Sequence, residues 1–356
     1  MARREIKVER PTADDVHEAL TRVPPEGAIV RLPAGSIPID RPLDLPSATT
    51  LAGAGRGQTV LEATAGLATV VTATKGRNVT VRDLTITWPG DAADQAQEDG
   101  AALLFRAIYR PEVLAVEVLG PPATAAWFDR CTHLRIDGLR IRNAGRTGLL
   151  ATACRHLAAD DITVDGAGLR RTASGVHLDG AQEARMHVDA ARASGSAVLL
   201  DATSGPVEEV AMHVNATHSL RGFSAIAAAP HPVRRVTLSG TFADNRRDGI
   251  LLVNANRVVI LDAVVERNAE HGIVLDGRTG SRRCTITGTV IRGCPVPFAE
   301  LGGSRDNAIS FVQPPAPIAS TPEKTAGRTR LSLRRRARRA AIVRVRRAWH
   351  ARGGRP

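Results

Sequence analysis

A short motif of the form Gly-apolar-x-apolar recurs along the chain and sets the pattern of hydrophobic and polar positions. Clear copies begin at Gly175, Gly222, Gly249 and Gly272, and in another copy Ala197 replaces the glycine. Alternation of apolar and other residues within each copy is typical of a β-strand with one buried face. Successive copies end 24, 23, 27, 22, 25, 27 and 23 residues apart, at Phe105, Asp129, Thr152, Asp179, Asp201, Ile226, Val253 and Asp276.

A second alternating segment precedes most copies of the motif, so each repeat contains at least two predicted strands. Examples are Leu134–Ile136, Met186–Val188 and Val236–Leu238. A repeat of 22–27 residues is too short for a β-α-β unit, which needs about 30 residues or more. The leucine and asparagine spacing of a leucine-rich repeat is absent, and a β-sandwich would not keep a fixed period. The pattern predicts an all-β fold, a right-handed parallel β-helix in which each coil contacts only its neighbours.

The beginning of the chain predicts a helical cap on this solenoid. Thr12 stands before the apolar residues Val16, Ala19 and Leu20, which is the pattern of a capped amphipathic helix. A cap is physically useful, because the first coil of a solenoid otherwise exposes an unpaired strand edge.

Together with the repeats, this beginning resembles the pectate-lyase-like β-helix proteins over roughly residues 11–312. The resemblance implies the fold, and it implies action on saccharides along the outer face of the solenoid. The catalytic motifs of individual subfamilies are not retained. The segment Glu270–Ile273 keeps only His-Gly of the Gly-His-Gly of polygalacturonases, and Ala229–Pro232 lacks both acids of the Asp-Pro-His-Asp of alginate epimerases. No catalytic residue is therefore carried over from a family motif.

The net charge of +12 is concentrated at the end of the chain. Residues 328–356 contain 12 arginines and no acidic residue; removing them from the 48 basic residues leaves 36, which equals the number of acidic residues. We therefore predict a β-helix with its cap over 1–311, a Pro-rich linker over 312–327 and an Arg-rich tail over 328–356, either disordered or an amphipathic helix.

The Arg-rich tail, Arg328–Pro356, admits three interpretations: a solvated tail, a segment that docks on an anionic membrane surface, or a binder of nucleic acid or of an acidic protein. Nucleic acid is disfavoured, because aromatic residues that could stack on bases are scarce. No run of about 18 apolar residues occurs, and Met1–Arg10 is charged, without an apolar core. The four cysteines fit no zinc spacing. We expect a reduced, cytoplasmic protein, peripheral to a membrane if the tail docks there.

Strand alternation predicts which side chains of the Gly-apolar-x-apolar segments point outward. One outward column is Leu103, Trp127, Leu150, His177, Leu199, Ser224, Leu251 and Val274. The next is Phe105, Asp129, Thr152, Asp179, Asp201, Ile226, Val253 and Asp276. Polar and aromatic groups gather on the coils from Trp127 to Asp201.

These columns supply the candidate catalytic residues His177, Asp179 and Asp201. The two carboxylates lie one coil apart, about 5 Å, so we expect them to share a proton and to raise one pKa. Such a pair can divide acid and base roles in glycosidic or uronate chemistry, and His177 is a second base. The alternative is turn chemistry, because an aspartate before a glycine, as in Asp179-Gly180, commonly binds backbone N–H groups.

The candidate substrate-binding residues are Trp127, which could stack on a sugar ring, Asp129 in the neighbouring column, and Arg171 and Arg221, which could hold a carboxylate or phosphate. No metal ion and no cofactor is predicted, since no ligand cluster can be assembled from the sequence.

By resemblance, the expected function is that of a carbohydrate-active enzyme, a lyase, epimerase or hydrolase that acts on an intracellular glycan or glycoconjugate. The alternative is a non-catalytic β-helix scaffold that binds a protein or a saccharide. In that case the apolar outward residues Leu199, Leu251 and Val274 would meet a partner, and the tail would tether the protein to an anionic membrane.

Overall fold

Successive coils of the chain stack in register and form a parallel β-helix of about 12 turns, which confirms the predicted fold. The computed structural model describes residues 4–64, 66–88, 100–169, 172–228 and 230–312. The chain divides into the units Met1–Pro314 and Pro315–Pro356, and all described residues belong to the first. The predicted tail and nearly all of the predicted linker lie outside the described residues, as does Arg171.

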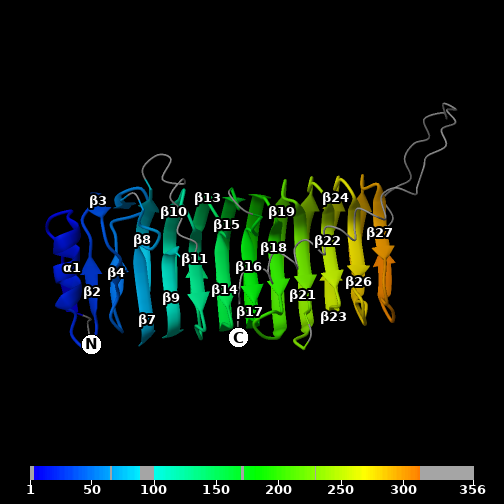
Figure 1. The fold of residues 1–356 in the computed structure, drawn as a ribbon, viewed down its shortest axis with the longest axis horizontal. Coiled ribbons are helices and arrows are strands. Elements are labelled where there is room, and N and C mark those ends of the chain that lie inside the picture. The colour runs from blue at the N-terminus through cyan, green and yellow to red at the C-terminus, as the bar shows by residue number, and fades with distance from the viewer. Residues whose placement is uncertain (1–3, 65, 89–99, 170–171, 229, 313–356) are drawn as a thin grey trace, which may run out of the picture. The chain divides into compact units, whose positions relative to one another are not determined.

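The outer face that carries the predicted site belongs to an 11-stranded sheet. Its strands follow one another along the solenoid in sequence order (Figure 1), and they pair in parallel, as β16 does with β14 and β18. They are β4 (Leu43–Asp44), β7 (Val71–Arg77), β9 (Ala101–Tyr109), β11 (Thr124–Asp129), β14 (Leu149–Thr152), β16 (Val176–Asp179), β18 (Ser196–Asp201), β20 (Arg221–Ile226), β22 (Asp248–Val253), β25 (His271–Asp276) and β27 (Val296–Glu300).

The remaining strands of the described chain form the 17-stranded sheet that closes each coil. They are β1 (Arg4–Lys7), β2 (Ala28–Arg31), β3 (Gly35–Ile39), β5 (Thr50–Ala52), β6 (Thr59–Ala63), β8 (Thr80–Thr87), β10 (Glu112–Leu119), β12 (Arg135–Asp137), β13 (Arg140–Ala144), β15 (Arg155–Ala167), β17 (Gln182–Ala193), β19 (Val207–Thr217), β21 (Val233–Ala243), β23 (Asn256–Leu261), β24 (Val264–Glu266), β26 (Thr285–Arg292) and β28 (Ala308–Phe311).

The helix α1 (Ala13–Thr21) covers the first coils, as predicted, and lies at the N-terminal end of the stack in Figure 1. Its N-cap Thr12 accepts a hydrogen bond from the Asp15 backbone N–H through Oγ1 at 3.3 Å. Val16, Ala19 and Leu20 are buried against the solenoid. Within the described residues, no helix has both the length and the apolar character needed to cross a membrane.

Corners between strands place non-glycine residues in the left-handed region of backbone space. One corner repeats this at His133, His156, Glu183, Glu209, Arg235, Arg257 and Arg283, all with φ between 53° and 57°. Each such residue costs about 1–2 kcal/mol, and the cost is offset by bonds to the next coil, such as His133 N–H to the Arg155 carbonyl at 2.9 Å. Side chains at this corner therefore point outward above one another.

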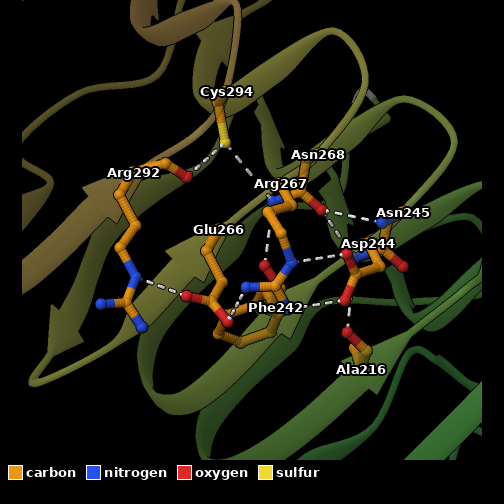
Figure 2. Close-up of polar contacts among 9 residues, drawn as sticks. All are labelled: Ala216, Phe242, Asp244, Asn245, Glu266, Arg267, Asn268, Arg292 and Cys294. Carbon is orange, nitrogen blue, oxygen red and sulfur yellow. Dashed lines mark hydrogen bonds and ion pairs between the residues drawn. The ribbon is translucent and has the colours of Figure 1, made fainter. Parts of the chain in front are cut away.

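A ladder of buried asparagines fixes another corner. Asn268 Oδ1 accepts from the backbone N–H and from Nδ2 of Asn245, at 3.1 and 2.9 Å, while Asn268 Nδ2 donates to the Phe242 carbonyl at 2.9 Å. Figure 2 shows this ladder beside an outer row of ion pairs in which Arg267 lies between Asp244 and Glu266. Both asparagines are 1% exposed, so the ladder satisfies polar backbone groups that would otherwise be buried without partners.

The core is a set of stacked aliphatic columns with few aromatic rings. Phe105 packs edge to face on Phe128 with centroids 5.7 Å apart, and Phe223 packs similarly on Phe242. Cys131 and Cys154 are fully buried one coil apart, and the neighbouring Cys131 thiol, together with burial, raises the pKa of the Cys154 thiol. Cys131 and Cys154 thus form a stack of buried thiols in successive coils.

Candidate functional site

The register of the 11-stranded sheet confirms the two outward columns from Trp127 onward and corrects their first members. Trp127 is paired with Leu104 and Asp129 with Arg106, so Leu104 and Arg106 begin the columns. Leu103 and Phe105, which the sequence places there, are 0% exposed and belong to the core. The error arose because the copy at β9 has no glycine to mark its first residue. An alignment that is wrong by one position assigns every side chain of a strand to the opposite face.

The structure brings His177 and Asp201 together. The imidazole Nε2 of His177 lies 3.8 Å from Oδ2 of Asp201, and the two side chains are 22% and 25% exposed. This Nε2 is shielded from solvent and has no hydrogen-bond partner among the described residues. Burial lowers the pKa of His177, while the charges of Asp201 and Asp179 oppose the shift. His177 is therefore held neutral at pH 7, the state in which an imidazole can accept a proton.

The carboxylates of Asp179 and Asp201 have partners in the loop after β18. Asp179 accepts hydrogen bonds from the backbone N–H and the hydroxyl of Ser204, at 2.7 and 2.5 Å. Asp201 accepts one from the Thr203 hydroxyl at 2.7 Å. The two residues are in register on adjacent strands, as expected. Asp179 nevertheless makes the turn contacts that the alternative interpretation describes, so it is less available for acid–base work.

Two of the predicted substrate-binding residues, Trp127 and Asp129, lie on the same face and have contacts of their own. Trp127 donates from Nε1 to the Thr152 hydroxyl at 3.3 Å, and the Arg106 guanidinium lies 5.1 Å from its ring centroid. Asp129 pairs with Arg130 at 2.9 Å. One face of the Trp127 ring therefore already carries a cation.

Arg221 belongs to a third outward column, which strict alternation does not predict. Its Nε donates to Oδ2 of Asp248 at 3.0 Å, and Oδ1 of the same carboxylate lies 2.7 Å from Nδ1 of His271. The Asp248 side chain is 5% exposed, that of His271 15% and that of Arg221 22%. A buried carboxylate thus holds an imidazole on one oxygen and a guanidinium on the other.

Glycines explain why this third column points outward. A Cβ on Gly249 would lie 2.6 Å from Cγ1 of the buried Val265 and 2.7 Å from the Gly272 carbonyl oxygen. Gly249 and Ile250 therefore both face inward, and the residue before them faces outward. This geometry brings together Arg221, Asp248 and His271, each of which precedes the glycine of one of three successive repeats. Their shared position before the glycine is the sequence signal that could have identified them.

The cluster also contains Glu270, paired with Arg247 at 3.1 Å. Ligand atoms of Asp248, Glu270 and His271 lie within 4.8 Å of one another, a spacing that a metal ion could use. The guanidinium groups of Arg221 and Arg247 already balance the two carboxylates, and a cation would have to compete with them. We therefore treat the cluster as an acid–base group.

A hydrogen bond joins the third column to the first. The hydroxyls of Ser196 and Ser224 lie 2.8 Å apart and are buried between the two groups described above. We use the name polar strip for His177, Ser196, Asp201, Arg221, Ser224, Asp248 and His271, which extend from β16 to β25.

Comparisons with known proteins identify the architecture. No protein-family model matches the chain, and no curated protein matches its sequence. Among solved structures, the A-module of mannuronan C-5 epimerase AlgE4 from Azotobacter vinelandii superposes with a TM-score of 0.64 and 17% identity, over 85% of this chain and 94% of that one. At this identity the match shows a shared parallel β-helix.

Two further structures share the architecture. The catalytic domain of a GH87 α-1,3-glucanase in complex with nigerose gives a TM-score of 0.51 and 13% identity, over 87% of this chain and 68% of that one. Gene product 12 of bacteriophage phi29 gives 0.62 and 14%, over 86% of this chain and 52% of that one. The fold alone therefore does not define a reaction.

Proposed function

We propose that this protein is a carbohydrate-active enzyme that removes a proton next to the carboxylate of a uronate residue, with His271 as the base. The single observation that carries the proposal is the contact between His271 and the buried Asp248. A carboxylate that accepts from Nδ1 fixes the tautomer and the orientation of an imidazole, and it leaves Nε2 to exchange a proton with a substrate.

Arg221 supplies a site for the substrate carboxylate. It binds Asp248 through Nε, and no described residue accepts a hydrogen bond from its two terminal nitrogens. A guanidinium can hold a carboxylate through those nitrogens. Its charge would stabilise the negative charge that develops when the neighbouring C–H bond breaks.

The reaction can take two courses once the proton has been removed. His271 Nε2 takes the proton from the sugar carbon next to the carboxylate, and the electron pair of that bond moves toward the carboxylate. Return of a proton from a solvent water on the opposite face gives an epimer. Alternatively, the C–O bond on the next ring carbon breaks, a C=C bond forms, and the leaving oxygen takes the proton from the His271 imidazolium, which gives an unsaturated product. Epimerase and lyase chemistry both use this first step.

His177 and Asp201 would bind further sugar units along the polar strip, and Trp127 would bind sugar further along the same sheet. Hydrolysis is less well supported, because it needs two available carboxylates about 5–5.5 Å or about 6.5–9.5 Å apart, and Asp179 is bound to Ser204. Of the three apolar residues that the scaffold alternative invokes, Val274 is 4% exposed, whereas Leu199 and Leu251 are half-buried.

A product assay with matched variants tests the proposal. Polymannuronate, polygalacturonate and a neutral glucan are incubated with the wild type, with His271→Ala and with His218→Ala, whose histidine is exposed at another corner. We expect the wild type and His218→Ala to convert a uronate polymer and His271→Ala to be inactive. Conversion of only the neutral glucan, or full activity of His271→Ala, would contradict it.

A further inference from the structure

A second groove lies on the other sheet, on the outer face of β15, β17, β19 and β21. One hollow has a volume of about 520 Å³, and an adjoining hollow of about 500 Å³ shares four of its lining residues, Ala158, Arg185, Ala211 and Thr237. We call these two hollows the second groove. None of the residues of the polar strip lines it.

The register of the strands explains the hollows. Arg135, Ala158, Arg185, Ala211 and Thr237 occupy one outward column in five successive coils. Long arginine side chains therefore alternate with alanines, which end at Cβ. Arg185 stands between two such gaps, so its guanidinium borders both hollows.

The charges that line the second groove leave one cation unmatched among the described residues. Each carboxylate has a cationic or imidazole partner: Asp137 with Arg135 at 3.3 Å, Asp160 with His187 at 2.7 Å, Glu183 with His156 at 2.8 Å, and Glu209 with Arg235 at 3.0 Å. Arg185 has no hydrogen bond or ion pair with any described residue. The groove therefore has at its centre a guanidinium, that of Arg185, which no described carboxylate neutralises.

Two imidazoles complete the set of groups that face a ligand. His187 bonds Asp160 through Nδ1, and His213 lies 3.0 Å from the Ser239 hydroxyl through Nδ1. Both side chains are exposed, and no described residue bonds either Nε2. The floor of the second groove consists of alanine methyl groups. It is bordered by the Nε2 atoms of His187 and His213, by the Arg185 guanidinium and by the Thr237 hydroxyl.

We infer that the second groove is a binding site for an anionic saccharide, with its carboxylate or sulfate group on Arg185. A planar guanidinium matches such oxyanions in geometry and charge. The imidazoles and hydroxyls can bond sugar hydroxyls, and the alanine floor leaves room for the ring. This site binds without turnover, and it does not depend on the chemistry proposed for His271.

Calorimetric titration of the full chain with short oligomannuronate, oligogalacturonate and a sulfated oligosaccharide tests this site, with a neutral oligosaccharide and inorganic sulfate as comparison ligands. Arg185→Gln should lower the affinity for an anionic oligosaccharide about tenfold, the scale of one charge-assisted hydrogen bond. The matched control is Arg257→Gln, which removes another exposed arginine outside both hollows. Ala158→Glu should have an effect similar to Arg185→Gln, because Ala158 is paired in register with Arg185 and a carboxylate there would occupy the guanidinium.

Loss of binding in Arg185→Gln and Ala158→Glu, with Arg257→Gln unchanged, supports the site whether or not any uronate is converted. Equal affinities in all four proteins would overturn it, and so would binding of inorganic sulfate as tight as that of the oligosaccharides. Activity measured in parallel separates the two proposals, since Arg185→Gln should leave turnover at His271 intact.

Discussion

Oδ1 of Asp248 lies 2.7 Å from Nδ1 of His271, and this carboxylate is the most buried member of the polar strip that carries a charge. Because Oδ2 of Asp248 also binds Arg221, one side chain orients both the proposed base and the proposed carboxylate-binding group. A buried ion pair contributes little net stability, so its presence on an outer face fits a role in the site better than a role in folding.

Replacement of Asp248 by asparagine should separate chemistry from folding. A neutral amide at this position cannot hold His271 as an anion does, so turnover should fall by about 100-fold or more, within the range that acid–base groups contribute. The control Asp244→Asn breaks the pair with Arg267 on another corner and should leave turnover unchanged. Steady-state rates and thermal midpoints of both variants give the comparison; equal turnover in the two would remove Asp248 from the mechanism.

Gly249→Ala should destabilise the coil that carries Asp248. The new methyl group would meet Val265, the Gly272 carbonyl and Asn268 Nδ2 at 2.6–2.8 Å, and overpacking of this kind costs about 1–3 kcal/mol. Gly205→Ala is the control, because a Cβ there has only ordinary contacts, the nearest at 3.6 Å. Urea denaturation measures the stability of both variants. An unchanged midpoint for Gly249→Ala would show that the residues around Gly249 can shift to accept a methyl group without loss of stability.

Asn268→Ala should lower stability more than a surface asparagine substitution does. It removes the Asn268 partners of the Phe242 carbonyl and of the Asn245 backbone N–H inside the solenoid, at about 1–3 kcal/mol for each unsatisfied group. Asn215→Ala removes only a bond to Asp189 on the surface and should cost little. Denaturant midpoints that fell equally for the two variants would argue against the ladder as a source of stability.

The lowered pKa of His177 predicts a pH effect on stability. Its folded-state pKa lies below the unfolded value of about 6.5, so the unfolded chain takes up the proton first as the pH falls. Stability should therefore be lost on acidification below about pH 6.5 and be unaffected by this group above it. The unfolding free energies of the wild type and of His177→Asn are measured from pH 7.5 to 5, and the two values should converge or cross as the pH falls. A difference between them that stays constant over this range would contradict the lowered pKa of His177.

Removal of residues 328–356 should abolish binding to vesicles that contain anionic lipid, if the 12 arginines dock there. Each basic residue near such a surface contributes about 1 kcal/mol. Flotation of the full chain and of the shortened chain with anionic and with neutral vesicles measures this. Equal flotation of the two chains would exclude the tail as the membrane-binding segment.

The fold could be predicted from the sequence because one regularity governs it. The spacing of copies between Trp127 and Asp276 places residues about two dozen positions apart in register, as the pairings of His177 with Leu150 and Leu199 confirm. The helical cap was likewise predictable from Thr12 and the apolar residues after it.

The site was less predictable, because strict alternation fails at the glycines. Two inward residues in succession, Gly249 and Ile250, turn Asp248 outward, whereas a period of two would place it in the core. The same local kink brings Arg221 and His271 beside it. Contacts within loops, such as those of Ser204 with Asp179, depend on geometry that no periodic pattern encodes.

Proton exchange at the substrate carbon tests the central claim most directly. Polymannuronate or polygalacturonate is incubated in D₂O with the wild type, Asp248→Asn, His271→Ala and His218→Ala, and deuterium at the carbon next to the carboxylate, together with unsaturated ends, is followed by NMR. The account predicts deuterium or unsaturation with the wild type and His218→Ala and none with His271→Ala. Equal rates for the wild type and His271→Ala, or cleavage of the polymer with neither signal, would contradict it.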